Sequence, residues 1–163
     1  MLALTIEDQK LFTRELLTGT TFDSLLLSKA VIHHNIDYVV EGHYNSKFFT
    51  KEEWEEKGCN LYAAWEEVKP YIFQIMKGKH LPVSFQIVLR ASQQTVEKLL
   101  SSSGSSLLLD QVEGLFLNIH YNDENLTITT GSSYSLFTMD KSLELAFDEA
   151  IKKLIARSHI AFY

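Results

Sequence analysis

Residues 83–90, Val-Ser-Phe-Gln-Ile-Val-Leu-Arg, decide the fold class, because apolar side chains occupy every second position. A period of two is typical of a strand that buries one of its faces. Ser92 then provides an N-cap for a helix over residues 93–102. Beyond that helix, alternating apolar residues separated by turn residues predict three strands, at Leu115–Tyr121, Leu126–Thr130 and Tyr134–Met139. The second half of the chain is therefore expected to form an antiparallel meander.

The N-terminal part repeats this order of elements. A short strand at Leu2–Thr5 is followed by a helix over Ile6–Leu17. β-branched and aromatic residues then predict three strands, at Phe22–His34, Ile36–Glu41 and Tyr44–Phe49. The chain is thus predicted to be a pseudo-duplicated βαβββ unit, with a helical insertion between the two halves and a C-terminal helix after them.

This order resembles the half-domain repeat of DNA sliding clamps. The resemblance implies that the helices of the two repeats would meet DNA. The helix over residues 6–17 offers Lys10 and Arg14, but beside them stand acidic residues, at positions 7, 8 and 15. A helix face of mixed charge binds the phosphate backbone poorly, which disfavours a DNA-encircling role.

The helical insertion begins with Thr50, an N-cap residue that is followed by Glu52 and Glu53, where the helix dipole favours carboxylates. This pattern predicts a short helix over residues 51–57. Apolar residues at helical spacing predict a second helix from Leu61 to Met76, kinked at Pro70. After the meander, an N-cap at residue 140 predicts the final helix.

The composition is that of a globular protein. The chain has 163 residues, of which 45% are hydrophobic and 22% charged, and we expect one domain spanning residues 1–163. The expected fold is α+β with a mainly antiparallel sheet, about seven strands and four or five helices.

The net charge and the single cysteine bear on partners and compartment. Fifteen Lys and Arg against 21 Asp and Glu give a net charge of -6, which disfavours a nucleic-acid coat or a binder of anionic membranes. No stretch approaches the roughly 18 apolar residues of a membrane span. Cys59 is the only cysteine, so a reducing compartment, the cytoplasm, is expected, with Cys59 as a small packing residue.

A second resemblance covers nearly the whole chain and rests on five short segments. They read TFDS at 21–24, KGK at 77–79 with Pro82, QVEGLFLN at 111–118, TTG at 129–131 and MDKSLE at 139–144. These segments resemble those of a family of short proteins of low-GC Gram-positive bacteria that is described as a domain of unknown function. The resemblance implies a bacterial, cytoplasmic, stand-alone domain. It implies no activity and no catalytic residues.

A metal site has three candidate ligands in the sequence. Glu41 and His43 lie two residues apart on a strand and therefore share a face, and His33 lies across the predicted hairpin. The alternative is that these side chains are simply solvated. We favour that alternative, and no metal or other cofactor is expected.

Four residues are candidates for partner binding. Trp54 lies among the glutamates of the inserted helix, where an aromatic side chain either folds inward or anchors a partner. The C-terminal tail carries Ile160, Phe162 and Tyr163. These residues either pack back on the body or form a short partner-binding peptide, and packing is favoured because exposed apolar tails lower solubility.

No nucleophile elbow, phosphate-binding loop or dinucleotide fingerprint is present in the sequence. The sequence therefore favours a non-enzymatic binding or interaction module with an unknown protein partner. Two alternatives stay open. One is a clamp-like subunit associated with DNA, and the other is a small metal- or ligand-dependent enzyme that uses the hairpin histidines.

Overall fold

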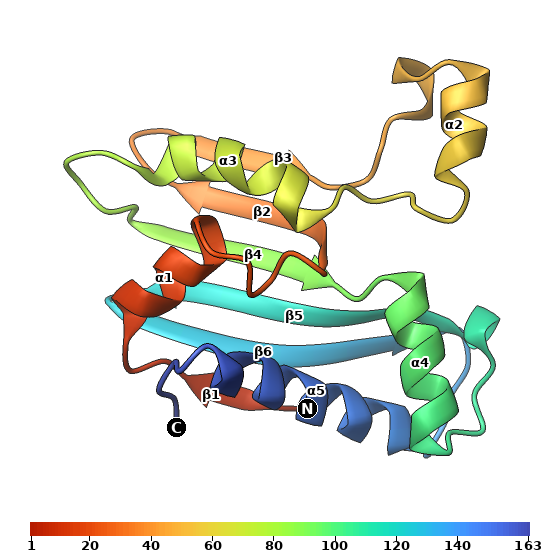
Figure 1. Ribbon diagram of the computed structural model, residues 1–163. Coiled ribbons are helices and arrows are strands. Elements are labelled where there is room, and N and C mark those ends of the chain that lie inside the picture. Colours follow the sequence, from red (N-terminus) through yellow and green to blue (C-terminus); the bar gives the residue numbers. More distant parts are fainter.

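Six strands form one antiparallel sheet in the order β1-β6-β5-β4-β2-β3 in the computed structural model, which describes residues 1–163 (Figure 1). The strands are Ala3–Thr5 (β1), Leu26–His33 (β2), Asp37–Glu41 (β3), Ser84–Arg90 (β4), Val112–Asn122 (β5) and Asn125–Tyr134 (β6). The helices are Gln9–Leu17 (α1), Lys51–Lys57 (α2), Trp65–Met76 (α3), Gln93–Ser103 (α4) and Ser142–Arg157 (α5). The α+β class with an antiparallel sheet is confirmed.

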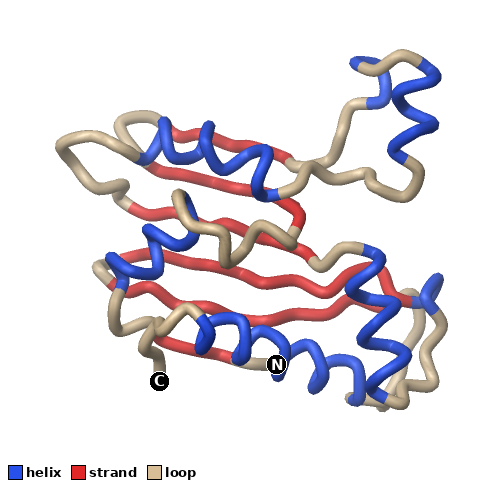
Figure 2. The backbone as a smooth tube through the Cα atoms, viewed as in Figure 1, coloured by secondary structure: helices blue, strands red, loops and turns tan.

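The helices α1, α3 and α5 lie over one face of the sheet (Figures 1 and 2). Burial alternates along the strands beneath them, as in β4, where Phe85, Ile87 and Leu89 are buried while Gln86 is exposed. This is the alternation that residues 83–90 predict. None of the helices combines the length and apolar character needed to cross a membrane.

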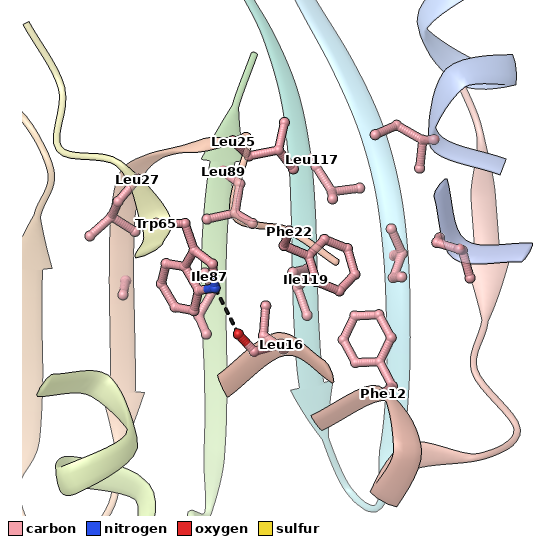
Figure 3. Packing of buried hydrophobic residues seen from close by; sticks show 14 of the residues in the cluster. Phe12, Leu16, Phe22, Leu25, Leu27, Trp65, Ile87, Leu89, Leu117 and Ile119 are labelled. Carbon is pink, nitrogen blue, oxygen red and sulfur yellow. Dashed lines mark hydrogen bonds between the residues drawn. The ribbon is translucent and has the colours of Figure 1, made fainter. Parts of the chain in front are cut away.

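The core lies between the helices and the sheet (Figure 3). The Phe12 ring of α1 packs on Phe22, with ring centroids 5.4 Å apart. The indole of Trp65, at the start of α3, is fully buried and donates a hydrogen bond from Nε1 to the carbonyl oxygen of Leu16 at 2.7 Å. That carbonyl belongs to the last turn of α1, where helix carbonyls have no partner within the helix. Trp65 therefore joins α1 to α3 through both packing and a hydrogen bond.

Two predicted strands are wrong. Residues 44–49 form a loop with a short 3-10 turn, Ser46–Phe48, and have no facing strand. Phe49 packs on Trp54, and Phe48 packs on Phe49. Residues 135–139 also form a loop, because β6 extends to Tyr134 and the chain then turns away. The two halves are therefore βαββ runs within one sheet, and the sheet has six strands.

The predicted helical insertion is confirmed, with a later start for its second helix. α2 spans residues 51–57 and begins with a capping box between Thr50 and Glu53. α3 begins at Trp65 and not at Leu61, because the preceding residues are extended and pair with the start of β2. The amide of Leu27 donates to the carbonyl of Ala63 at 2.8 Å. Pro70 lies inside α3, which continues as one helix.

The loop before α5 is held by the carboxylate of Asp140. It accepts hydrogen bonds from the hydroxyl and, at 2.9 Å, the amide of Ser142, and from the amide of Ser106 at 3.0 Å. These donors, the Ser142 hydroxyl first, hold the pKa of Asp140 well below its usual range. Asp140 therefore holds the start of α5 and joins it to the loop after α4. The N-cap itself falls one residue later than predicted, on Lys141, whose side chain makes no capping hydrogen bond.

Candidate functional site

The largest concave surface is a groove of about 730 Å³ between α1 and the C-terminal end of α3, over one end of the sheet. We call it the α1–α3 groove. Its lining comes from α1 and the residues before it, from α3 and the loop after it, and from strands β4, β5 and β6: Glu7, Asp8, Gln9, Lys10, Thr13, Arg14, Leu17, Thr18, Phe73, Met76, Lys77, Leu81, Pro82, Phe85, Tyr121 and Leu126.

Aromatic and aliphatic side chains make up the apolar part of this lining. Phe85 of β4 lies directly opposite Tyr121 of β5 in the strand register. Their rings stack with centroids 5.3 Å apart and an interplanar angle of 21°. Leu126 of β6 pairs with Tyr121 in turn, so three adjacent strands contribute to one surface. Leu81, in the loop after α3, is 80% exposed and offers further apolar area.

Three cations belong to the groove, Lys10 and Arg14 from α1 and Lys77 from the end of α3. Lys10 and Arg14 are four residues apart and therefore share one face of α1. None of the three forms an ion pair within 4.0 Å, while Lys69, Lys141 and Lys152 elsewhere do. The groove thus holds three free cations in a protein whose net charge is -6.

Two carboxylates, Glu7 and Asp8, also line the groove. The Asp8 carboxylate is occupied as the N-cap of α1, where it accepts a hydrogen bond from the amide of Leu11 at 3.0 Å. Glu7 donates its backbone amide to the carbonyl of Ala161 in the C-terminal tail. Neither contact neutralises a carboxylate, so three cations against two carboxylates leave the groove with a net charge of +1.

The two walls of the groove are fixed relative to each other. Lys69 of α3 donates hydrogen bonds to the carbonyl of Gly19 at 2.5 Å and to the carboxylate of Asp23 at 2.6 Å, in the loop that follows α1. The buried hydrogen bond from Trp65 to Leu16 is a second link between the two helices. An apolar surface flanked by cations and held in place suits a molecule with an apolar body and an anionic group.

The structure does not bring the three metal candidates together. His33 lies opposite Asp37 in the strand register, and their side chains are 2.8 Å apart. Glu41 lies four residues further along β3, within 4.0 Å of Lys29 and 3.1 Å from His43. No group of three or more His, Cys, Asp or Glu side chains could hold a metal ion.

Trp54 lies in a segment that leaves the sheet after β3 and returns before α3, and we call residues 43–62 the arm (Figure 2). Its indole is half-buried and packs on Phe49, with ring centroids 5.9 Å apart. Tyr44 packs on Phe49 from another side, and its hydroxyl donates to Glu67 at 2.7 Å. Desolvation and this hydrogen bond raise the pKa of Tyr44 to about 12. Trp54 is therefore part of an aromatic cluster that belongs to the arm itself.

The C-terminal tail packs on the body. Ile160 is buried at 3% exposure, and Phe162 forms an isolated bridge with Ile6. The amide of Tyr163 donates to the carbonyl of Thr5 at 3.0 Å, while the side chain of Tyr163 is 73% exposed. Of the three candidate residues of the tail, only Tyr163 offers a free side chain.

Cys59 is exposed at the base of the arm, so its predicted packing role is wrong. It follows the C-cap of α2, Gly58, and lines a second pocket of about 360 Å³. In that pocket the Arg90 guanidinium stacks over the ring of Tyr62 at 4.2 Å and donates to the carbonyl of Glu113 at 2.8 Å. Arg90 therefore serves to hold the base of the arm against the sheet.

The groove was not predicted from the sequence. Its residues come from five separate elements, and no local motif connects them. The one local signal is on α1, where Lys10 and Arg14 lie four residues apart on one face, with Glu7 three residues before Lys10.

One family profile matches residues 15–163, and the family is described as a family of unknown function (DUF5721). No curated protein matches the chain, and no solved structure does. The geometry of the groove is therefore the basis for assigning a function.

Proposed function

We propose that this chain, which belongs to the family of unknown function (DUF5721), is a non-enzymatic binding module. In this proposal the α1–α3 groove binds a small amphipathic anion. The ligand class is a carboxylate or phosphate monoester with an apolar body. The observation that carries the proposal is the combination of the stacked Phe85–Tyr121 pair with three unpaired cations in one groove.

The size and lining of the groove support this proposal. Its volume of about 730 Å³ falls within the range of roughly 300–1,000 Å³ that is typical of small-molecule sites. Such sites are mostly apolar with a few polar groups that orient the ligand. Here the apolar surface would hold the body of the ligand, while Lys10, Arg14 and Lys77 would attract its anionic group. We further propose that the protein acts in the bacterial cytoplasm, in keeping with its single cysteine.

Titration with decanoate, followed by amide chemical shifts in NMR, tests the proposal. Saturable shifts are expected at α1, at the end of α3 and at Phe85 and Tyr121. Decanol, which has the same chain and no charge, should bind more weakly. The Lys10→Ala/Arg14→Ala variant should bind decanoate about tenfold more weakly, because exposed charge pairs contribute up to about 1 kcal/mol each.

Two further variants separate the contributions. Lys98→Ala removes an exposed lysine from α4, away from the groove, and should leave the affinity unchanged. Leu81→Ser removes an exposed apolar side chain of the groove and should weaken decanoate and decanol alike. If decanoate produces no saturable shifts in the groove, or if Lys98→Ala weakens it as much as the α1 variant, the proposal is wrong.

A further inference from the structure

The arm exposes one aromatic residue, Phe48, that nothing in the chain covers. Between residues 43 and 62 every residue is exposed or half-buried, and Phe48 at the tip is 81% exposed. Phe48 packs edge-on against Phe49, at 5.1 Å between ring centroids, and the Lys57 ammonium lies 4.4 Å from the Phe49 ring. Large exposed aromatic residues of this kind are the usual anchors of protein interfaces.

The arm is held in one position by its base. The amide of Ala63 donates to the carbonyl of Gly42, and the amide of Tyr44 donates to the carbonyl of Leu61, both at 2.8 Å. The hydroxyl of Tyr44 is bonded to Glu67 of α3. An ordered arm loses little conformational entropy when it binds, so its aromatic residues are presented ready for a partner.

The exposed area of the protein exceeds that of a compact monomer of the same mass. The chain exposes 9,684 Å² for a mass of 18.7 kDa. A compact monomer of this mass exposes about 8,300 Å² by the usual size scaling, so roughly 1,400 Å² is in excess. A standard protein interface buries about 800 Å² on each partner. The excess comes close to the roughly 1,600 Å² that a chain buries when it both offers the arm and receives one.

The charge of α2 indicates which surface of a second copy the arm can bind. Glu52, Glu55 and Glu56 of α2 form no ion pair within 4.0 Å, so two arms packed against each other would bring like charges together. The α1–α3 groove differs, since its lining is partly apolar and its three free cations outnumber its two carboxylates. An exposed phenylalanine beside glutamates matches an apolar groove beside lysine and arginine.

The arm cannot reach the groove of its own chain. Trp65 begins α3 at the base of the arm, while Met76, at the other end of α3, lines the groove. Twelve helical residues separate these two places by about 18 Å. In Figure 1 the arm and α1 accordingly lie toward opposite ends of the molecule. We propose that the arm of one copy docks, through Phe48 and the α2 glutamates, in the α1–α3 groove of a second copy.

This contact is heterologous, joining two different surfaces, so it produces head-to-tail assemblies. It uses the groove of the proposed function with a different occupant. A small anion and the arm of another copy then exclude each other, and decanoate dissociates the assembly. The inference goes beyond the proposed function, because the contact between copies does not require that a small ligand binds.

Sedimentation velocity of the full chain over a wide range of concentrations tests this inference. The wild-type sedimentation coefficient should rise with concentration and fall with added salt. Phe48→Glu and Lys10→Glu/Arg14→Glu should each be monomeric, since the first lacks a competent arm and the second a competent groove. All three positions are exposed, so the variants are expected to fold. Lys98→Glu is the matched control and should assemble like the wild type.

The decisive sample is an equimolar mixture of the two monomeric variants. Only one head-to-tail contact can form in it, so the mixture should give a dimer and nothing larger. The inference is overturned by a monomeric wild type, by a mixture that stays monomeric, or by a Lys10→Glu/Arg14→Glu variant that still assembles, which would indicate arm-to-arm contact.

Decanoate binding by the monomeric Phe48→Glu variant tests the proposed function separately. If decanoate binds there but leaves the wild-type assembly intact, the arm does not occupy the groove.

Discussion

The two tryptophans offer a matched test of how the core is held together. Trp65 is fully buried and donates a hydrogen bond to the carbonyl of Leu16 at 2.7 Å. Trp54 is half-buried in the arm and packs on Phe49. Replacing each by phenylalanine keeps an aromatic ring but removes the indole N–H and part of the volume. The two substitutions are therefore chemically identical and differ only in their surroundings.

Trp65→Phe should cost about 2–4 kcal/mol of unfolding free energy. The carbonyl of Leu16 would lose its partner in a dry site, which costs roughly 1–3 kcal/mol. The smaller ring would add the loss of buried apolar surface and a small cavity, about 1 kcal/mol. For a chain of this size, each kcal/mol lowers the melting temperature by roughly 2–4 °C. Trp54→Phe should cost less than about 1 kcal/mol, as is usual for surface positions.

Urea unfolding followed by circular dichroism measures both variants, because fluorescence would depend on the substituted residues themselves. The midpoint should fall clearly for Trp65→Phe, with an unchanged slope, and barely move for Trp54→Phe. Equal losses for the two variants, or a loss below about 1 kcal/mol at Trp65, would show that the hydrogen bond to α1 does not stabilise the fold.

Three further outcomes are expected. Asp140 has a lowered pKa, so the stability it contributes is present above its unfolded pKa of about 3.9. That stability is lost as the pH falls through the lower pKa of the folded state. Asp140→Asn should therefore destabilise at neutral pH, and the difference in urea midpoint from the wild type should shrink in acid. Tyr44, with its pKa raised to about 12, should stay protonated at pH values where exposed tyrosines ionise, which the ultraviolet difference spectrum against Tyr44→Phe measures. Glu67→Gln should lower the pKa of Tyr44. A phenolate signal of Tyr44 near the ordinary tyrosine pKa in the folded protein would contradict this. Gly42→Ala should destabilise by about 1–3 kcal/mol, since a Cβ there overlaps the carbonyl oxygen of Leu27 in β2. Gly131→Ala should cost less in the same urea assay, because a Cβ there meets only Nδ2 of Asn118, at an ordinary contact distance of 3.8 Å.

The secondary structure was largely predictable from local pattern. The alternation over residues 83–90 predicted β4, and the Thr50 cap predicted α2. Both signals are properties of neighbouring residues. The pattern failed at residues 44–49 and 135–139, where residues suited to strands have no adjacent strand to pair with. Strand formation depends on a hydrogen-bonding partner, and local sequence does not say whether one is present.

The candidate site was not predictable in the same way. The groove depends on the strand register that sets Phe85 against Tyr121, and on the packing of α1 beside α3. Register also separated the residues that the sequence proposed as metal ligands, because His33 pairs with Asp37 and not with Glu41. A shift in register would have changed both results without changing a single local propensity.

By itself the sequence determined the class of the fold, the helices, most of the strands and the charge of the arm, because these follow from periodicity, capping and composition over a few residues. The tertiary structure alone decided which surfaces exist. It placed three free cations of α1 and the end of α3 beside a stacked aromatic pair, and it left Phe48 of the arm uncovered. Both depend on contacts between residues far apart in the chain, whose geometry is set only when the sheet pairs and the helices pack on it.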